Sequence, residues 1–181
     1  MKYPGITLGR VEAVWNKLGG EEGVDRFLRD EFVINKSIVC VYPVIIDFSL
    51  SLADMIKAGK YNWVNDSITA RNFPMKGEET AEVTIKLIHF SRVMENGDAV
   101  IHKLDRKGMR PATIEELLAL GQVYPDLQRK FPIVALGSVW RSPRGYRYVP
   151  YLWGNAGGRD LYLLWFDRRW NGHSRFAAVR K

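Results

Sequence analysis

Apolar side chains recur at helical spacing near the beginning of the chain. They form one stripe over residues 8–18, which stops at Gly19-Gly20 and comprises Leu8, Val11, Val14, Trp15 and Leu18. A second short helix is predicted over residues 21–29. Two helices joined by glycines are compatible with a DNA-binding helix-turn-helix. However, Glu21, Glu22 and Asp25 place negative charge where a groove-reading helix needs neutral or basic contacts, so we favour a helical hairpin or bent helix that covers a sheet.

The following segment combines apolar runs with turn residues. A strand is predicted over residues 38–48, in which Pro43 favours an edge position or a bulge because proline cannot donate a ladder hydrogen bond. A short helix over residues 51–57 and a second strand over residues 67–73 are predicted next, with a loop over residues 59–66 between them.

A short charged stretch at residues 76–79 is the best internal boundary, because it has no apolar side chain. We therefore predict an N-terminal α/β extension over residues 1–79, which packs against a domain over residues 80–181.

The second part begins with an alternating strand at Val83, Ile85 and Leu87. A helix is predicted over residues 98–107, closed by Gly108. Thr113 and Glu116 have the spacing of a capping box, which starts a second helix that ends at Gly121. Short strands follow at residues 133–136, 147–152, 161–166 and 175–179, joined by polar loops at residues 142–145, 154–158 and 167–174.

Two of these segments resemble the two ends of a C-type-lectin-like domain, as in formylglycine-generating enzymes and the variable proteins of diversity-generating retroelements. Residues 108–118 read GMRPATIEELL, similar to the G-x-R-x-P-T-x-x-E turn of that family, and residues 175–181 read RFAAVRK, similar to its closing strand. The resemblance covers residues 80–181 and implies an α+β C-type-lectin-like fold. In this fold the first strand, near residues 83–89, pairs with the last, at residues 175–180. The stretch AVWNKLGG near the N-terminus also resembles short bacterial proteins of candidate phyla.

Composition sets the protein class. With 181 residues and 46% apolar content the chain is long enough to bury a core, which excludes disorder along its whole length. No run approaches the about 20 apolar residues that span a bilayer, and no signal-peptide core follows Met1, so we expect no membrane span. Cys40 is the single cysteine, which we expect to be a small core residue, and the chain is predicted to be cytoplasmic.

Positive charge concentrates near the C-terminus. The net charge is +7, and from Arg141 onward eight arginines and one lysine face only Asp160 and Asp167. Tyrosines and tryptophans are interleaved with these arginines, a mixture that suits recognition of anions or stacking on planar groups. A solvated basic surface without a ligand is the alternative explanation.

Residue patterns for catalysis are sparse. His89, His102 and His173 lack the close spacing of a metal site, and no glycine-rich phosphate loop is present. The oxidase activity of the formylglycine-generating relatives requires cysteines in the lectin-like domain, which this chain lacks, and the calcium motifs of sugar-binding lectins are also missing. We therefore predict a protein that is not an enzyme and has no cofactor and no metal.

The remaining hypothesis is a binding module for a partner protein or small ligand. Its predicted ligand-binding residues lie near the C-terminus: Tyr162, Leu164, Phe166, Asp167, Arg168, Arg169, Asn171, Gly172, His173 and Ser174. Trp165 and Phe176 are expected in the core, whereas Arg168, Arg169, Asn171 and His173 are expected to be exposed. The alternative is nucleic-acid binding by the same basic, aromatic surface.

The resemblance to retroelement variable proteins also implies that this segment is diversified. In those proteins adenine-directed mutagenesis changes codons that began as asparagine, which reaches Asn, Asp, Tyr, His, Ser, Gly, Arg, Leu and Phe but not Trp or Lys. Residues 162–174 use this set almost throughout, broken by Leu163, Trp165 and Trp170 as expected framework positions. An ordinary binding surface of the same residue types is the alternative.

Overall fold

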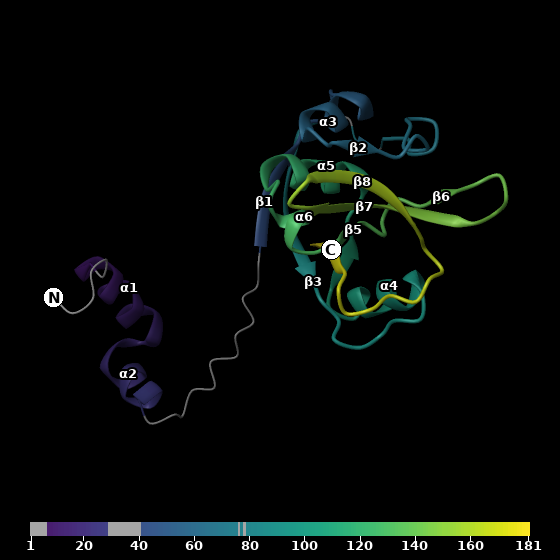
Figure 1. Cartoon of the computed structure of the whole chain (residues 1–181). Coiled ribbons are helices and arrows are strands. Elements are labelled where there is room, and N and C mark those ends of the chain that lie inside the picture. The colour runs from purple at the N-terminus through teal and green to yellow at the C-terminus, as the bar shows by residue number, and fades with distance from the viewer. Residues whose placement is uncertain (1–6, 29–40, 76, 78) are drawn as a thin grey trace. The chain divides into compact units, whose positions relative to one another are not determined.

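The computed structural model describes residues 7–28, 41–75, 77 and 79–181. The chain divides into two compact units, Met1–Ile38 and Val39–Lys181 (Figure 1). The described part of the first unit consists of α1 (Leu8–Leu18) and α2 (Gly20–Leu28). Gly19 and Gly20 have positive φ angles of 93° and 76°, so the predicted pair of helices joined by glycines is confirmed.

The described part of the second unit is a mixed α/β structure built on one large sheet. In chain order its elements are β1 (Val41–Ile46), α3 (Leu52–Gly59), β2 (Trp63–Val64), β3 (Ala81–Ile88), α4 (Gly97–Asp105), β4 (Met109–Pro111), α5 (Ile114–Val123), α6 (Leu127–Lys130), β5 (Ile133–Val134), β6 (Trp140–Arg141), β7 (Arg147–Asn155), β8 (Gly158–Trp165) and β9 (Arg175–Arg180). The strands follow the order β1-β3-β9-β5-β7-β8-β2, with β4 also paired to β9 and β6 to β7.

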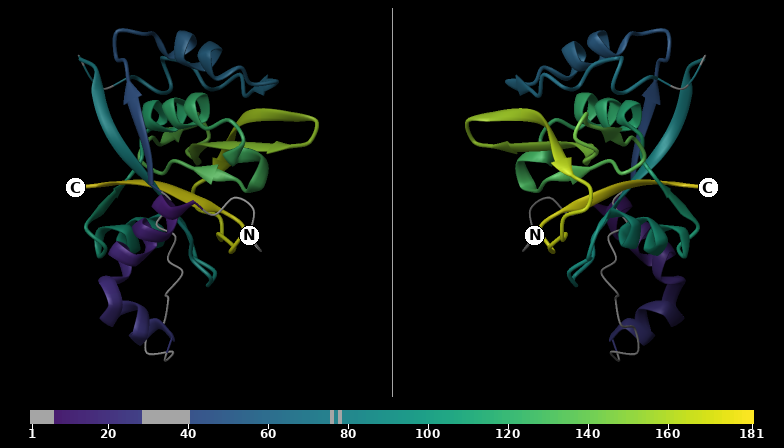
Figure 2. Two further views of the ribbon diagram at one scale, coloured as in Figure 1. Left: turned by 90° about the vertical axis from the view of Figure 1, so that its left-hand side faces the viewer. Right: turned by 90° about the vertical axis from the view of Figure 1, so that its right-hand side faces the viewer.

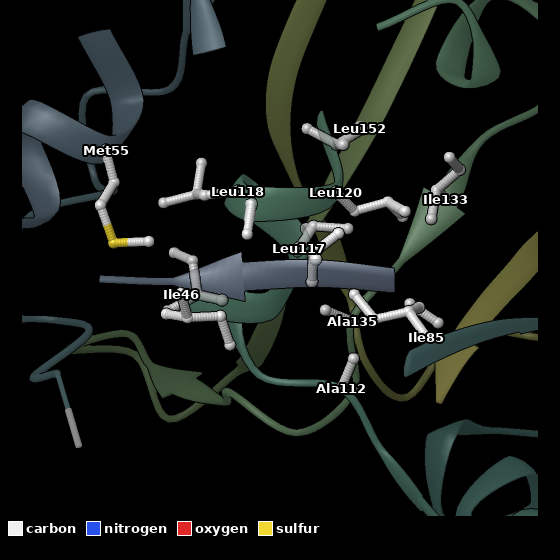
Figure 3. Packing of buried hydrophobic residues seen from close by; sticks show 14 of the residues in the cluster. Ile46, Met55, Ile85, Ala112, Leu117, Leu118, Leu120, Ile133, Ala135 and Leu152 are labelled. Carbon is white, nitrogen blue, oxygen red and sulfur yellow. The ribbon is translucent and has the colours of Figure 1, made fainter. Parts of the chain in front are cut away.

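The central strand β9 is buried on both faces, and its side chains alternate between two cores. Ala177 and Val179 belong to a core that includes buried residues of α3 and α5, whereas Phe176 and Ala178 belong to a core that includes residues of α4. Figure 2 shows α5 between α3 and the strands, and Figure 3 shows the first core, in which leucines of α5 lie among side chains of α3, β1 and β7. Helices therefore cover both faces of the sheet.

The predicted pairing of the strand near residues 83–89 with the strand at residues 175–180 is confirmed. β3 and β9 are antiparallel, with Ile85 opposite Val179. The predicted edge position of Pro43 is also confirmed, because β1 is the outermost strand on this side.

The division into two compact units does not coincide with the predicted boundary at residues 79/80. All six residues of β1 pair with β3, and Leu52 and Met55 of α3 belong to the same core as α5. The separation between the two compact units lies instead between Ile38 and Val39. Cys40 lies outside the described residues.

The start of α5 has the predicted capping box. The backbone N–H of Thr113 donates to Glu116 Oε2 at 2.8 Å. The buried Glu116 carboxylate also accepts two hydrogen bonds from the Arg110 guanidinium, at 2.9 and 2.6 Å. This charged pair fixes the turn between β4 and α5, next to the end of β9.

Two sequence-based predictions about local structure fail. Residues 67–73 form turns instead of a strand, although Ile68 and Phe73 are buried there. The predicted loop over residues 154–158 is mostly strand, because β7 and β8 extend until Asn155 pairs with Gly158. Within the described ranges, no helix has the length and apolar character needed to cross a bilayer.

Candidate functional site

The β7–β8 hairpin has two faces, each covered by helices at only one end. Residues opposite each other in an antiparallel pair share a face, so Tyr151 and Tyr162 point the same way, as do Trp153 and Asp160. On this face Phe166, directly after β8, is buried in the core that contains α4 residues. On the other face Leu161 is buried in the core that contains α5 residues. Each face is therefore open at the end that its helices do not reach.

At the open end of the first face, aromatic rings from three strands come together. We call Trp63, Tyr151, Trp153 and Tyr162 the aromatic face. The Trp63 and Tyr162 rings stack with centroids 4.2 Å apart, and the Tyr151 and Tyr162 rings lie 5.9 Å apart. Trp63 is 42% exposed and Trp153 is also exposed, whereas Tyr151 and Tyr162 are half-buried, so the two tryptophans present the solvent-accessible part of this face.

Charged groups act on the aromatic face from its edges. Partial burial raises the pKa of Tyr151, and the nearby Tyr162 and Asp160 raise it further, whereas the positive charge of Arg168 opposes this shift. Arg168 is exposed and its guanidinium lies 5.6 Å from the centre of the Trp170 ring. The face thus combines aromatic area with one acid and one arginine.

The segment from Asp167 to Ser174 is anchored by Trp170. Its backbone exchanges two hydrogen bonds with Met94, at 2.8 and 2.9 Å, and its indole is buried against Phe176 with ring centroids 5.5 Å apart. His89 Nε2 donates to the carbonyl oxygen of Gly172 at 2.9 Å. These contacts with Met94, Phe176 and His89 therefore fix the backbone of this polar segment.

Around this anchor, Arg168, Arg169, Asn171 and His173 are exposed, as predicted. Arg169 forms an ion pair with Glu95 at 3.1 Å. Tyr162 and Leu164 are half-buried on β8, on the side of the aromatic face. Asp167 is engaged by the Arg147 guanidinium, which also contacts Asp98.

Three placements differ from the sequence-based prediction. Phe166 and Ser174 were expected in the ligand-binding surface but are buried. Phe166 lies beneath α4, where a Cβ atom on Gly97 would come within 2.5 Å of its ring. Trp165, expected in the core, is 45% exposed because the core containing α5 residues does not extend to this end of β8.

The predicted ligand-binding residues did not include Trp63, Tyr151 or Trp153, although Tyr151 and Trp153 belong to the aromatic residues interleaved with the C-terminal arginines. The alternation along the predicted strand at residues 147–152 contained the signal for Tyr151, since it faces away from the buried Leu152. Trp63 had no such signal, because only the parallel pairing of β2 with β8 brings it beside Asp160.

The described residues contain no group of three or more histidine, cysteine or acidic side chains placed to hold a metal ion. His102 is exposed on α4 and takes no part in the contact between His89 and Gly172. In comparisons with known proteins, no family model, no curated protein and no solved structure matches the chain.

Proposed function

We propose that the chain is a non-enzymatic binding module that binds a partner protein or small ligand through the aromatic face and the neighbouring residues Arg168, Arg169, Asn171 and His173. The observation that carries this proposal is the exposed stack of Trp63 on Tyr162. Exposed tryptophan, tyrosine and arginine are the residue types that dominate binding hot spots, because they give large contact area and directional bonds.

We propose that the frame of this module is C-type-lectin-like. The order of β3, α4, α5, the β7–β8 hairpin and β9 supports this, as does the antiparallel pairing of β3 with β9. Both features agree with the expectation from the GMRPATIEELL and RFAAVRK segments.

We further propose that the exposed residues vary between copies of the protein on a constant frame, as in retroelement variable proteins. The arrangement around Trp170 supports this. Trp170 is the buried anchor, and adenine-directed mutagenesis does not produce tryptophan. The residues exposed around it belong to the set that such mutagenesis reaches. A nearby reverse-transcriptase gene with an imperfect template repeat of the last codons is expected. A locus without either, whose relatives differ here no more than elsewhere, would contradict diversification.

A pair of display libraries tests the binding function. One library is randomised at Tyr162, Leu164, Arg168 and Arg169, and the control library at the exposed α4 residues His102 and Lys103 and at Arg106 and Lys107. Both are first selected for protease resistance and then for binding to one purified target protein. We expect folded variants in both libraries, but binders enriched in the first alone. Loss of folding throughout the first library, or equal enrichment in both, would contradict the proposed display surface.

The alternative, nucleic-acid binding by the whole basic C-terminal surface, draws less support. Arg159 is buried and bonded to backbone carbonyls, and Arg147 is neutralised by two aspartates. Arg175 donates to nearby carbonyls and lies over the Phe131 ring. A salt titration of binding to single- and double-stranded DNA separates the two functions, since phosphate neutralisation predicts affinity that falls linearly in log salt.

A further inference from the structure

A second hollowed surface lies on the opposite face of the β7–β8 hairpin, where the helices leave that face open. Two pockets of about 460 and 550 Å³ meet at Trp140 and Pro143, which line both. Their walls come from the β6–β7 hairpin, which projects from the unit in Figure 1, and from the turns after β2. We call these two pockets the Trp140 groove. Their volumes fall in the range of about 300–1,000 Å³ that is typical of small-molecule sites.

The groove offers aromatic surface for stacking. The Trp140 and Tyr148 rings lie 5.6 Å apart at 35°, and Trp140 packs against the core, so its orientation is fixed from behind. Tyr146, which also lines the first pocket, is 50% exposed and stands edge-on to Trp165 at 6.2 Å. A planar ring that enters the first pocket therefore meets aromatic side chains held in place.

The charge of the groove is entirely positive. Arg144 lines the first pocket and Arg71 and Arg141 line the second, whereas no aspartate or glutamate lines either pocket. All three arginines are exposed, and none forms an ion pair with a described residue. Unpaired guanidinium groups beside aromatic rings favour an anion, and in particular a phosphate, over a neutral sugar.

A polar atom in the first pocket also lacks a partner. The Ser142 Oγ atom is buried and has no hydrogen-bond partner among the described residues, although Ser142 lines the pocket. The facing wall is preformed, since Asn65 N–H donates to Leu161 O at 3.0 Å and the Asn65 side chain accepts from Ser67 N–H at 3.0 Å. The wall formed by Asn65 and Ser67 therefore needs no rearrangement when a ligand enters the pocket.

We propose that the Trp140 groove binds a nucleotide, with the base stacked among Trp140, Tyr146 and Tyr148 and the phosphate held by Arg71, Arg141 and Arg144. The site is separate from the aromatic face and does not rest on the function proposed for that face. Free mononucleotides and nucleotides within a single strand share this chemistry.

Isothermal titration calorimetry of the full chain tests the proposal, with AMP, adenosine, inorganic phosphate and a short oligothymidylate as probes. We expect AMP to bind at least about tenfold more tightly than adenosine or phosphate, because only AMP uses both the rings and the arginines. If the oligothymidylate binds more tightly than AMP, with an affinity that falls linearly in log salt, the bound nucleotide belongs to a single strand. An oligothymidylate no tighter than AMP identifies the free nucleotide.

Two sets of charge-matched variants locate the site. The triple variant Arg71→Gln, Arg141→Gln and Arg144→Gln removes three exposed guanidinium groups from the groove, and Arg168→Gln, Arg169→Gln and Arg180→Gln remove three from elsewhere. The groove variant should lose at least about tenfold in AMP affinity while the control variant and Tyr162→Ala retain it. Thermal unfolding checks that each variant is folded. Absence of saturable AMP binding at millimolar concentration, or equal losses in both triple variants, overturns the proposal.

Discussion

The guanidinium of Arg159 donates a hydrogen bond of 2.8 Å to the carbonyl oxygen of Gly59, the last residue of α3. It also donates to the carbonyl oxygen of Gly121 in α5 at 2.5 Å and to Gln128 Oε1 at 3.2 Å, and it lies over the Tyr61 ring. Helix C-termini carry partial negative charge. One buried cation therefore compensates the ends of two helices, and burial lowers the pKa of Arg159.

Replacing Arg159 should destabilise the second unit strongly. Arg159→Leu would leave the buried carbonyl oxygens of Gly59 and Gly121 without donors, so we expect a loss of about 2–4 kcal/mol in the free energy of unfolding. Arg159→Lys should recover part of it, because an ammonium group reaches fewer of these acceptors. Urea unfolding measures both, with the exposed Arg180→Leu as control; equal losses for Arg159→Leu and Arg180→Leu would refute the role of Arg159.

The glycine at position 121 is required by close packing. A Cβ atom there would overlap the Tyr61 hydroxyl and lie 2.9 Å from Leu152 Cδ1. We expect Gly121→Ala to cost about 1–3 kcal/mol. Tyr61→Phe alone should cost little, since the buried Tyr61 hydroxyl has no hydrogen-bond partner among the described residues. The double variant Tyr61→Phe, Gly121→Ala should be more stable than Gly121→Ala alone. Equal unfolding midpoints for the double variant and Gly121→Ala would show that the overlap is relieved elsewhere.

Two tryptophans five residues apart should respond differently to truncation. Trp170 is 1% exposed and anchors the polar segment, so Trp170→Ala should cost about 3–5 kcal/mol. Trp165 is exposed, and Trp165→Ala should change stability by about 0.5 kcal/mol or less. Thermal unfolding of the pair measures the contrast, and similar losses would mean that Trp165 is buried in solution.

Lys181 should lower the pKa of a carboxyl group at the end of α4. The Lys181 ammonium group contacts Asp105 and lowers the pKa of that carboxyl, chiefly through a hydrogen bond. Because the pKa is lower in the folded state, this contribution to stability is present above the pKa of the unfolded chain. It is lost as the pH falls through the folded pKa.

An NMR titration of the Asp105 carboxyl should therefore show a higher pKa in Lys181→Met than in the unmodified chain. Lys107→Met, which removes an exposed lysine after α4, serves as the charge control. Equal Asp105 pKa values in Lys181→Met and the unmodified chain would show that the pair does not form in solution.

Local patterns along the chain were sufficient to predict much of the sheet. The alternation at Val83, Ile85 and Leu87 predicted β3, and the spacing of Thr113 and Glu116 predicted the start of α5. Residues 67–73 failed because Ile68 and Phe73 are buried through turns, for which apolar spacing carries no signal.

The candidate site was harder to predict, because each part of it depends on distant elements. The prediction of the strand that contains Leu161 was correct. However, the exposure of Trp165 and the burial of Phe166 depend on how far the two cores, one with α5 residues and one with α4 residues, extend along this strand. Arg159 was counted with the surface arginines, and only the meeting of α3 and α5 places it inside. Both errors concern contacts that a single strand does not encode.

The alternation of side chains along β8 allows the two surfaces to change independently of each other. A substitution at Tyr162 or Leu164 alters one surface, whereas a substitution at Leu163 alters the other, so each can drift under its own selection. Insertion of one residue within this strand has the opposite effect, since it would exchange the two sets of side chains between the faces. Selection should therefore tolerate replacements at Tyr162, Leu163 and Leu164 but no change in the length of β8.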